Sequence, residues 1–327
     1  MSANEKNVKA NFFQKFTRNN SSEFTLLLVL VAFIILASIL SPHFLTASNL
    51  ANIGTSMSYI GVIAAGLTVV MLMGGIDLSQ MSAMAISVMV VGIMVKQGSN
   101  PLLVILCAIL VGAAAGLLNG FIIVVMRVMP MIATIGTQMI FRALAYITTN
   151  GKYMSFSNPV FDAIGYGNLL GVPIMMWIML LVFITIGFIL HYTRYGREVY
   201  AIGSNKDASY LSGIRIRRIQ AIGYTICGIT SGIAGILWAS QLGTAVSTAG
   251  EGSEMTPIAA VVIGGVSLSG GKGKIWGAFI GTALLSVFTN LMALMTVDAY
   301  YQKMLNGVVL ILAVFIDILR SSKKNKI

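Results

Sequence analysis

The stretch Gly265–Lys274 is the part of the sequence whose residue types come nearest to a phosphate-binding loop. A Walker A loop has the form Gly-x-x-x-x-Gly-Lys followed by Ser or Thr, whose hydroxyl binds a magnesium ion. Here Gly271-Lys272 is followed by Gly273, and Val266 stands where the first glycine is required. We therefore expect no cofactor on this chain, and we expect ATP and Mg²⁺ to be bound by a different chain.

Metal-ligating and nucleophilic side chains are few and far apart. Cys107 and Cys227 lie inside apolar runs, where cysteine behaves as a small hydrophobe, and His43 and His191 stand at the boundaries of such runs. A metal or catalytic site needs a cluster of these residues. The sequence therefore predicts no metal site, no catalytic residues and no membrane enzyme.

The composition indicates that these residues are surrounded by membrane-spanning helices. Of the 327 residues, 57% are hydrophobic and 9% are charged, whereas a soluble domain carries about 25% charged residues. This composition excludes a soluble enzyme, a nucleic-acid-binding protein and a disordered chain. Several of its ten apolar runs approach the ~20 residues that a helix needs to cross a membrane. The runs are Phe24–Leu40, Ile53–Met73, Leu78–Val95, Pro101–Met126, Met131–Thr148, Val172–Leu190, Ile219–Leu242, Pro257–Leu268, Ile275–Val297 and Tyr301–Leu319.

The distribution of the basic residues indicates how this bundle is oriented. The net charge is +11, from 21 Lys and Arg against 10 Asp and Glu. If both termini are cytoplasmic, the loops on the outside hold only Lys96, Lys152 and Lys303, as the positive-inside rule requires. The predicted fold class is all-α: a polytopic membrane helix bundle of about ten transmembrane helices with both termini cytoplasmic. Its parts are a cytoplasmic N-terminal segment (1–23), a transmembrane domain (24–319) and a cytoplasmic tail (320–327).

Two charged residues lie within or beside the apolar runs, where charge is costly and usually functional. Asp77 follows paired glycines and precedes Leu78-Ser79. We favour a role for Asp77 in capping the next helix over a role in a proton relay. Arg142 lies inside the fifth run, where it would extend to the membrane interface or serve docking, and the sequence leaves both roles open.

A short internal repeat suggests where a solute would cross the membrane. Gly74-Gly-Ile-Asp-Leu-Ser79 recurs as Gly264-Gly-Val-Ser-Leu-Ser269, and paired, glycine-broken segments in two halves of a chain are typical of a substrate path. The candidates for the path or its gate are Gly74, Gly75, Asp77, Asn119, Thr134, Gln138, Gly264, Gly265 and Asn290. Acidic residues in two predicted outer loops are candidates for docking an external partner, namely Asp162, Glu251 and Glu254.

The longest predicted cytoplasmic loop, Tyr192–Arg218, contains a short helix. Ser204-Asn-Lys-Asp207 has the Ser-x-x-Asp form of a helix start, and Gly213 is placed to end the helix. Ala208 and Leu211 then share an apolar face. A helix this short needs a partner surface to be stable, so we interpret it as a docking element; a plain basic loop is the alternative.

The same loop resembles that of the permeases of ribose-type ABC importers. The similar segments there are Tyr192–Arg197, Ala201–Asn205 and Leu211–Ile214. The resemblance extends in order from about Leu26 to Asp317, through the segments Gly74–Ser79, Ile132–Gly136, Thr149–Gly151, Ala259–Gly265, Ser267–Gly273, Tyr300–Tyr301 and Ala313–Asp317. One departure is Gln80-Met81, where relatives often have Val-Gly, and it puts the end of that motif in doubt.

The resemblance implies a multi-pass inner-membrane protein that imports a monosaccharide such as ribose or allose. It further implies a second copy of the permease, a periplasmic sugar-binding protein and a cytoplasmic ABC ATPase. The coupling helix of such permeases would correspond to Ser204, Asn205, Asp207, Ala208, Leu211 and Gly213. The alternative is an ion-coupled secondary transporter, which normally shows intramembrane carboxylates or histidines; this chain has almost none.

Overall fold

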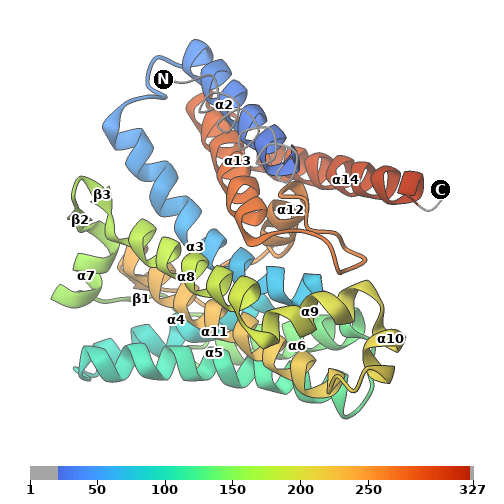
Figure 1. Cartoon of the computed structure of the whole chain (residues 1–327). Coiled ribbons are helices and arrows are strands. Elements are labelled where there is room, and N and C mark those ends of the chain that lie inside the picture. Colours follow the sequence, from blue (N-terminus) through green and yellow to red (C-terminus); the bar gives the residue numbers. More distant parts are fainter. Residues whose placement is uncertain (1–20, 325–327) are drawn as a thin grey trace, which may run out of the picture.

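The structure, a computed structural model, describes residues 21–324, so most of segment 1–23 and the end of segment 320–327 lie outside it. Each of the ten apolar runs overlaps a helix (Figure 1), although Pro257–Leu268 extends beyond its helix and Val172–Leu190 begins in a short strand. These helices are α2 (Ser21–Leu40), α3 (Ala47–Leu72), α4 (Gln80–Lys96), α5 (Pro101–Val124), α6 (Pro130–Ile147), α8 (Ile174–Tyr192), α11 (Ile216–Leu242), α12 (Met255–Ile263), α13 (Ile275–Leu294) and α14 (Ala299–Lys324). As the glycines after it predict, α12 is short.

The small elements lie at two opposite ends of this bundle (Figure 1). Strand β1 (Met154–Ser155) pairs antiparallel with β4 (Thr244–Ala245) beside the short helix α7 (Pro159–Tyr166), and β2 (Asn168–Leu169) forms a hairpin with β3 (Val172–Pro173). We call this end the hairpin face. The other end carries α9 (Arg194–Ser204) and α10 (Lys206–Leu211) and is called the α9–α10 face.

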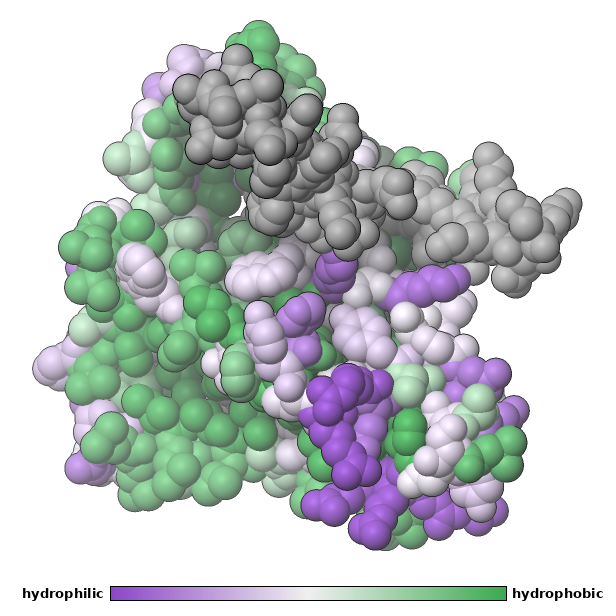
Figure 2. All heavy atoms as spheres, viewed as in Figure 1, coloured by the Kyte–Doolittle hydropathy of each residue, from purple (hydrophilic) through white to green (hydrophobic). Residues whose placement is uncertain are grey.

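The outer surface of the bundle is apolar. Within residues 21–324, six helices are long and apolar enough to cross a membrane: α2, α3, α5, α8, α11 and α13. Large apolar side chains stand exposed on them, including Ile39 and Leu102, each 75% exposed. Figure 2 shows this green surface, with hydrophilic residues gathered over α9 and α10. An apolar surface of this extent is expected to face lipid, so the fold is a polytopic membrane helix bundle.

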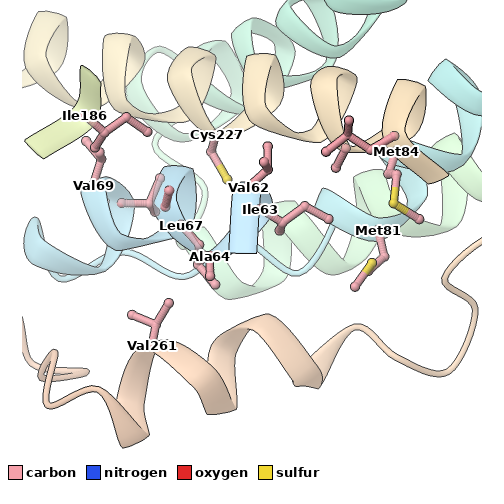
Figure 3. Packing of buried hydrophobic residues seen from close by; sticks show 14 of the residues in the cluster. Val62, Ile63, Ala64, Leu67, Val69, Met81, Met84, Ile186, Cys227 and Val261 are labelled. Atoms are coloured by element: carbon pink, nitrogen blue, oxygen red, sulfur yellow. The ribbon is translucent and has the colours of Figure 1, made fainter. Parts of the chain in front are cut away.

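Helices α3 and α11 form the centre of the bundle. In Figure 3, Val62 and Leu67 of α3 lie between Cys227 of α11 and Val261 of α12, and all four are fully buried. Helix α11 also crosses α5 at glycines: a Cβ on Gly112 of α5 would collide with the Gly228 carbonyl of α11, and a Cβ on Gly228 with that of Gly112. This is the close packing expected from small residues four positions apart.

Two pairs of successive helices, α3 with α4 and α11 with α12, are each joined by a non-helical turn inside the bundle. Helix α3 ends at the α9–α10 face and is followed by residues 73–79 before α4, while α11 ends at the hairpin face and is followed by residues 243–254 before α12. Moreover, α4 packs on α5 and α6 as α12 packs on α13 and α14. Helices α3–α6 and α11–α14 therefore share one packing pattern with opposite direction, the arrangement of an inverted repeat.

The inverted repeat does not relate the two similar segments that the sequence suggested as paired halves of a substrate path. Residues 74–79 and 264–269 are neighbours at the α9–α10 face, because a Cβ on Gly270 would lie 2.7 Å from the Gly74 amide nitrogen. The counterpart of the 73–79 turn in the inverted repeat is instead the 243–254 loop, which the sequence does not mark as similar. The two similar segments therefore form one local structure.

Candidate functional site

Asp77 organises the turn between α3 and α4. Its side chain is 2% exposed, and its Oδ1 atom accepts hydrogen bonds from the Ser79 amide at 2.9 Å and from the Ser79 hydroxyl at 2.7 Å. The Asn119 amide group of α5 donates to the Ser79 hydroxyl at 2.7 Å and to Asp77 Oδ2 at 3.4 Å. An aspartate that binds the backbone two residues on is a common turn-forming device. Asp77 thus fixes the turn before α4, but it does not cap that helix as the sequence suggested: its carboxylate binds the amide and hydroxyl of Ser79, the N-cap residue itself, and no side chain caps the first amides of α4.

Some of the candidate path residues gather at this turn, and one does not. Thr134 of α6 lies 3.4 Å from the Ile76 carbonyl, so it joins Asn119 beside the turn. Gln138 lies one turn further along α6 and is half-buried. Asn290 of α13 instead exchanges two hydrogen bonds of 2.8 and 2.9 Å with Asn49, near the start of α3 at the other end of that helix.

A backbone contact joins this turn to the α9–α10 face. The Gly271 amide donates to the Leu72 carbonyl at 2.8 Å, and Gly203 of α9 packs against both, since a Cβ there would collide with the Leu72 oxygen and the Gly271 nitrogen. We call these three residues the glycine contact. Tyr200 of α9 adds a hydrogen bond from its hydroxyl to the Gly273 carbonyl at 3.0 Å, and burial raises the pKa of this hydroxyl, which keeps it protonated as a donor.

The paired glycines of the sequence repeat lie near the glycine contact, and in each pair one glycine is exposed and the other is buried. Gly74 and Gly265 are exposed and have positive φ angles of 75° and 83°, which glycine adopts without strain. Gly75 and Gly264 are buried, where a Cβ would press on Tyr224 and on the Gly277 backbone respectively. The sequence marked these glycines but gave no sign of Leu72 and Gly203, whose role depends on which segments meet.

The short helix in the predicted docking loop is present, and its start differs by one residue. Ser204 ends α9, and the side-chain oxygen of Asn205 caps α10 by accepting a hydrogen bond from the Ala208 amide at 2.9 Å. Asp207 lies in the first turn. The predicted Ser204 cap is therefore wrong, because the Ser204 hydroxyl donates back to the Tyr200 carbonyl instead.

Helix α10 presents apolar side chains to the outside. Leu211 is 85% exposed and Tyr210 is 71% exposed, and Ala208 is exposed as well. The chain then leaves the helix through Gly213, whose φ is +79°. A six-residue helix with apolar side chains in solvent requires a covering surface to be stable.

Arg142 has a role that the sequence did not suggest. Its Nη1 atom donates to the carbonyls of Ser247 and Ala249 at 2.8 and 2.9 Å, and its Nη2 atom lies 3.8 Å from Glu254 Oε1. The guanidinium group therefore holds the 246–254 loop inside the bundle, since five N–H donors in a planar fork suit several carbonyls at once.

The three candidate docking acids are separated by the fold. Asp162 of α7 accepts a hydrogen bond from Ser157 at the hairpin face, and exposed Glu251 accepts one from the Tyr146 hydroxyl, both at 2.9 Å. Glu254 immediately precedes α12, and its side chain is 15% exposed beside Arg142. Within residues 21–324, no group of three or more His, Cys, Asp or Glu side chains could hold a metal ion.

These features define a class: a polytopic membrane transport protein, built on broken helices that turn inside the bundle. The chain belongs to the family described as "Branched-chain amino acid transport system / permease component", whose model matches residues 49–314. It is a multi-pass protein of the inner membrane.

Similar proteins of known name cover nearly the whole chain. The ribose import permease protein RbsC of Escherichia coli K12 is 40% identical over 306 residues, which is 92% of this chain and 95% of that protein. RbsC of Bacillus subtilis is 38% identical over 286 residues, covering 87% of this chain and 89% of that protein. The L-arabinose ABC transporter permease protein AraH of Azospirillum brasilense is 33% identical over 299 residues, or 90% and 88% of the two chains. No solved structure matches the chain.

Proposed function

We propose that this chain is the membrane permease subunit of an ATP-driven importer, and that it forms the path for a monosaccharide such as ribose, allose or a related sugar. The observation that carries the proposal is α10, which exposes Leu211 and Tyr210 at the α9–α10 face while its neighbour α9 packs on the centre of the bundle through Gly203. This arrangement suits a helix that binds an external protein and passes that protein's movement through α9 to the centre of the bundle. The kind of solute is inferred from relatives named for ribose and arabinose import.

The proposed topology has ten transmembrane spans and both termini in the cytoplasm. It is supported by the ion pair of 3.0 Å between Lys274 and Glu23, which draws the start of α2 to the α9–α10 face. This face also carries the basic residues of the Tyr192–Arg218 loop, as expected of a cytoplasmic surface. The transmembrane domain is residues 24–319, between the cytoplasmic segments 1–23 and 320–327.

The proposed partners lie on both sides of the membrane. A separate cytoplasmic ABC ATPase would bind ATP and Mg²⁺ and cover α10, while a periplasmic binding protein would deliver the sugar to the hairpin face near Asp162 and Glu251. A second copy of the permease would complete the path.

An ion-coupled secondary transporter is the weaker candidate. Such a protein needs a carboxylate or histidine that exchanges an ion during transport, but Asp77 is enclosed by donors from Ser79 and Asn119. The family is also one of transport-system permease components.

Reconstitution separates the two functions. The permease is placed in sealed vesicles with its binding protein outside, and with its ATPase and ATP inside. We expect uptake of radiolabelled D-ribose that requires both ATP and the ATPase and that persists when ion gradients are collapsed. Uptake driven by an ion gradient without the ATPase would contradict the proposal.

A further inference from the structure

The starts of the two broken helices meet inside the bundle. Gln80, the first residue of α4, donates from its side-chain amide to the carbonyl of Glu254, the residue before α12, at 3.2 Å. Neither helix start has a side-chain cap, and the first amides of a helix have no partner within the helix. At the start of α12, however, the Thr256 amide is bound by the Ser253 carbonyl and Pro257 has no N–H. The Gln80 side chain thus joins the two helix starts at one point, which we call the α4–α12 junction.

Two buried polar atoms at this junction have no hydrogen-bond partner in the described part of the chain. They are the side-chain oxygen of Gln80, a residue that is 1% exposed, and Nη2 of Arg142. One is an acceptor and the other a donor, and both side chains bind the backbone of the 247–254 loop. Buried polar groups are nearly always satisfied, so this pair indicates a missing polar group that both accepts and donates.

The charges around the junction are balanced. Arg142 lies beside Glu254. Glu251 nearby is accompanied by Lys303, whose ammonium group lies 3.3 Å from the place of a Cβ on Gly252. An ionic solute would leave an unpaired charge in a poorly solvated site, which is costly. A neutral polyhydroxyl compound adds no charge, and each of its hydroxyl groups offers one donor and two acceptor sites.

The junction also borders an open surface of the bundle. Met255, the first residue of α12, is 50% exposed, and Met139 of α6, one turn before Arg142, is 69% exposed. Around Gly136, a further turn back on α6, nothing lies within 4 Å of the place of a Cβ. Met255 directly follows Glu254, whose carbonyl binds Gln80, so this surface lies one residue from the junction along the chain.

We propose that Gln80 and Arg142, beside the start of α12, form a transient binding site for hydroxyl groups of the imported sugar. The sugar hydroxyls replace the missing partners of Gln80 and Arg142 as the solute passes between the two broken helices. This inference rests on the sugar-import function proposed above, and it assigns a specific use to Gln80, where the sequence departs from the ribose-type permeases.

The test compares Gln80→Met, which removes the polar atoms at nearly unchanged length, with Gln97→Met at the opposite end of the same helix, where the side chain is exposed. Uptake of D-ribose and of its 2-deoxy, 3-deoxy and 5-deoxy analogues is measured in the reconstituted complex with one binding protein throughout. A change in preference between variants therefore arises in the permease.

We expect the wild type to import at least one deoxy analogue less well than ribose, and Gln80→Met to reduce this preference about fivefold, as for one lost hydrogen bond. Gln97→Met leaves it unchanged. A purely structural role for Gln80 lowers all uptakes together, and an equal preference in Gln80→Met and wild type would overturn the inference. If the wild type imports neither ribose nor allose nor L-arabinose, each tested with a binding protein for that sugar, the proposed sugar function fails independently.

A second measurement does not depend on the folding of Gln80→Met. In a variant whose Cys107 and Cys227 are replaced by alanine, Met255→Cys places a thiol at the junction, and its reaction with a small thiol reagent is followed in the full complex with ATP. We expect D-ribose, but not L-glucose, to slow the reaction at least about threefold. An identical rate with both sugars would overturn the site.

Discussion

The Gly271 amide donates to the Leu72 carbonyl at 2.8 Å, and this bond joins the loop after α12 to the end of α3. Gly203 of α9 lies against both residues with no space for a side chain. A movement of α9 is therefore transmitted to the turn that carries Asp77, because close-packed backbones cannot be compressed. The glycine contact links α9, and through it α10, to the end of α3 at the centre of the bundle.

A methyl group at Gly203 should uncouple movement of α9 from the turn that carries Asp77. In Gly203→Ala the Cβ would press on the Leu72 oxygen and the Gly271 nitrogen, so we expect uptake to fall roughly tenfold, the effect of a coupling free energy of about 1.4 kcal/mol. The ATPase should still copurify, since α10 is unchanged. Gly307→Ala on α14 is the control, because no atom lies within 4 Å of that Cβ position; wild-type uptake by Gly203→Ala would contradict the link.

The exposed end of α10 should decide binding of the ATPase. Leu211→Asp places a charge where we expect an apolar groove on the partner, so copurification of the ATPase should fall at least about tenfold, as for an apolar interface anchor. Leu170→Asp is a matched control: Leu170 is 87% exposed, like Leu211 at 85%, but lies at the hairpin face. If Leu211→Asp retains the ATPase, α10 is not the docking element.

Asp77 should act through hydrogen bonds rather than through proton exchange. Asp77→Asn keeps an acceptor for the Ser79 amide, and the Asn119 side-chain oxygen, which has no hydrogen-bond partner among residues 21–324, can accept from the new amide after rotation. We expect this variant to keep most of its uptake, while Asp77→Ala loses about 1–3 kcal/mol of stability. Thermal unfolding in detergent and uptake are measured together; a stable Asp77→Asn variant without uptake would instead support a proton relay.

The proposed topology predicts which loops a protease reaches from each side. Arg215, Arg217 and Arg218 are exposed at the α9–α10 face, and Lys152 is exposed at the hairpin face. Trypsin added to the outside of sealed cells with a permeable outer membrane should cut at Lys152 and spare the arginines, and inside-out vesicles should show the reverse. Cleavage at the arginines from outside would invert the topology.

Part of the site could be predicted because it depends on local sequence. Asp77 was expected to cap the next helix; it lies in the turn before α4, as expected, but binds the N-cap residue Ser79 instead of the helix amides. The short helix near Leu211 was expected from its capping residues and glycine stop. The one-residue error at the start of α10 arose because Ser204 and Asn205 are both good N-caps, and packing of α9 on the bundle determines which of them is free to cap.

Hydrophobic run lengths were sufficient to predict an all-helical membrane bundle and its main helices, whereas the family was predicted from the resemblance of short sequence motifs. The bundle and its helices depend on the average environment of each segment, which composition records. The glycine contact, the role of Arg142 and the meeting of Gln80 with Glu254 were decided only by the tertiary structure. Each joins residues between 68 and 199 positions apart, and a sequence pattern cannot show which distant backbone groups will lie together once the helices pack.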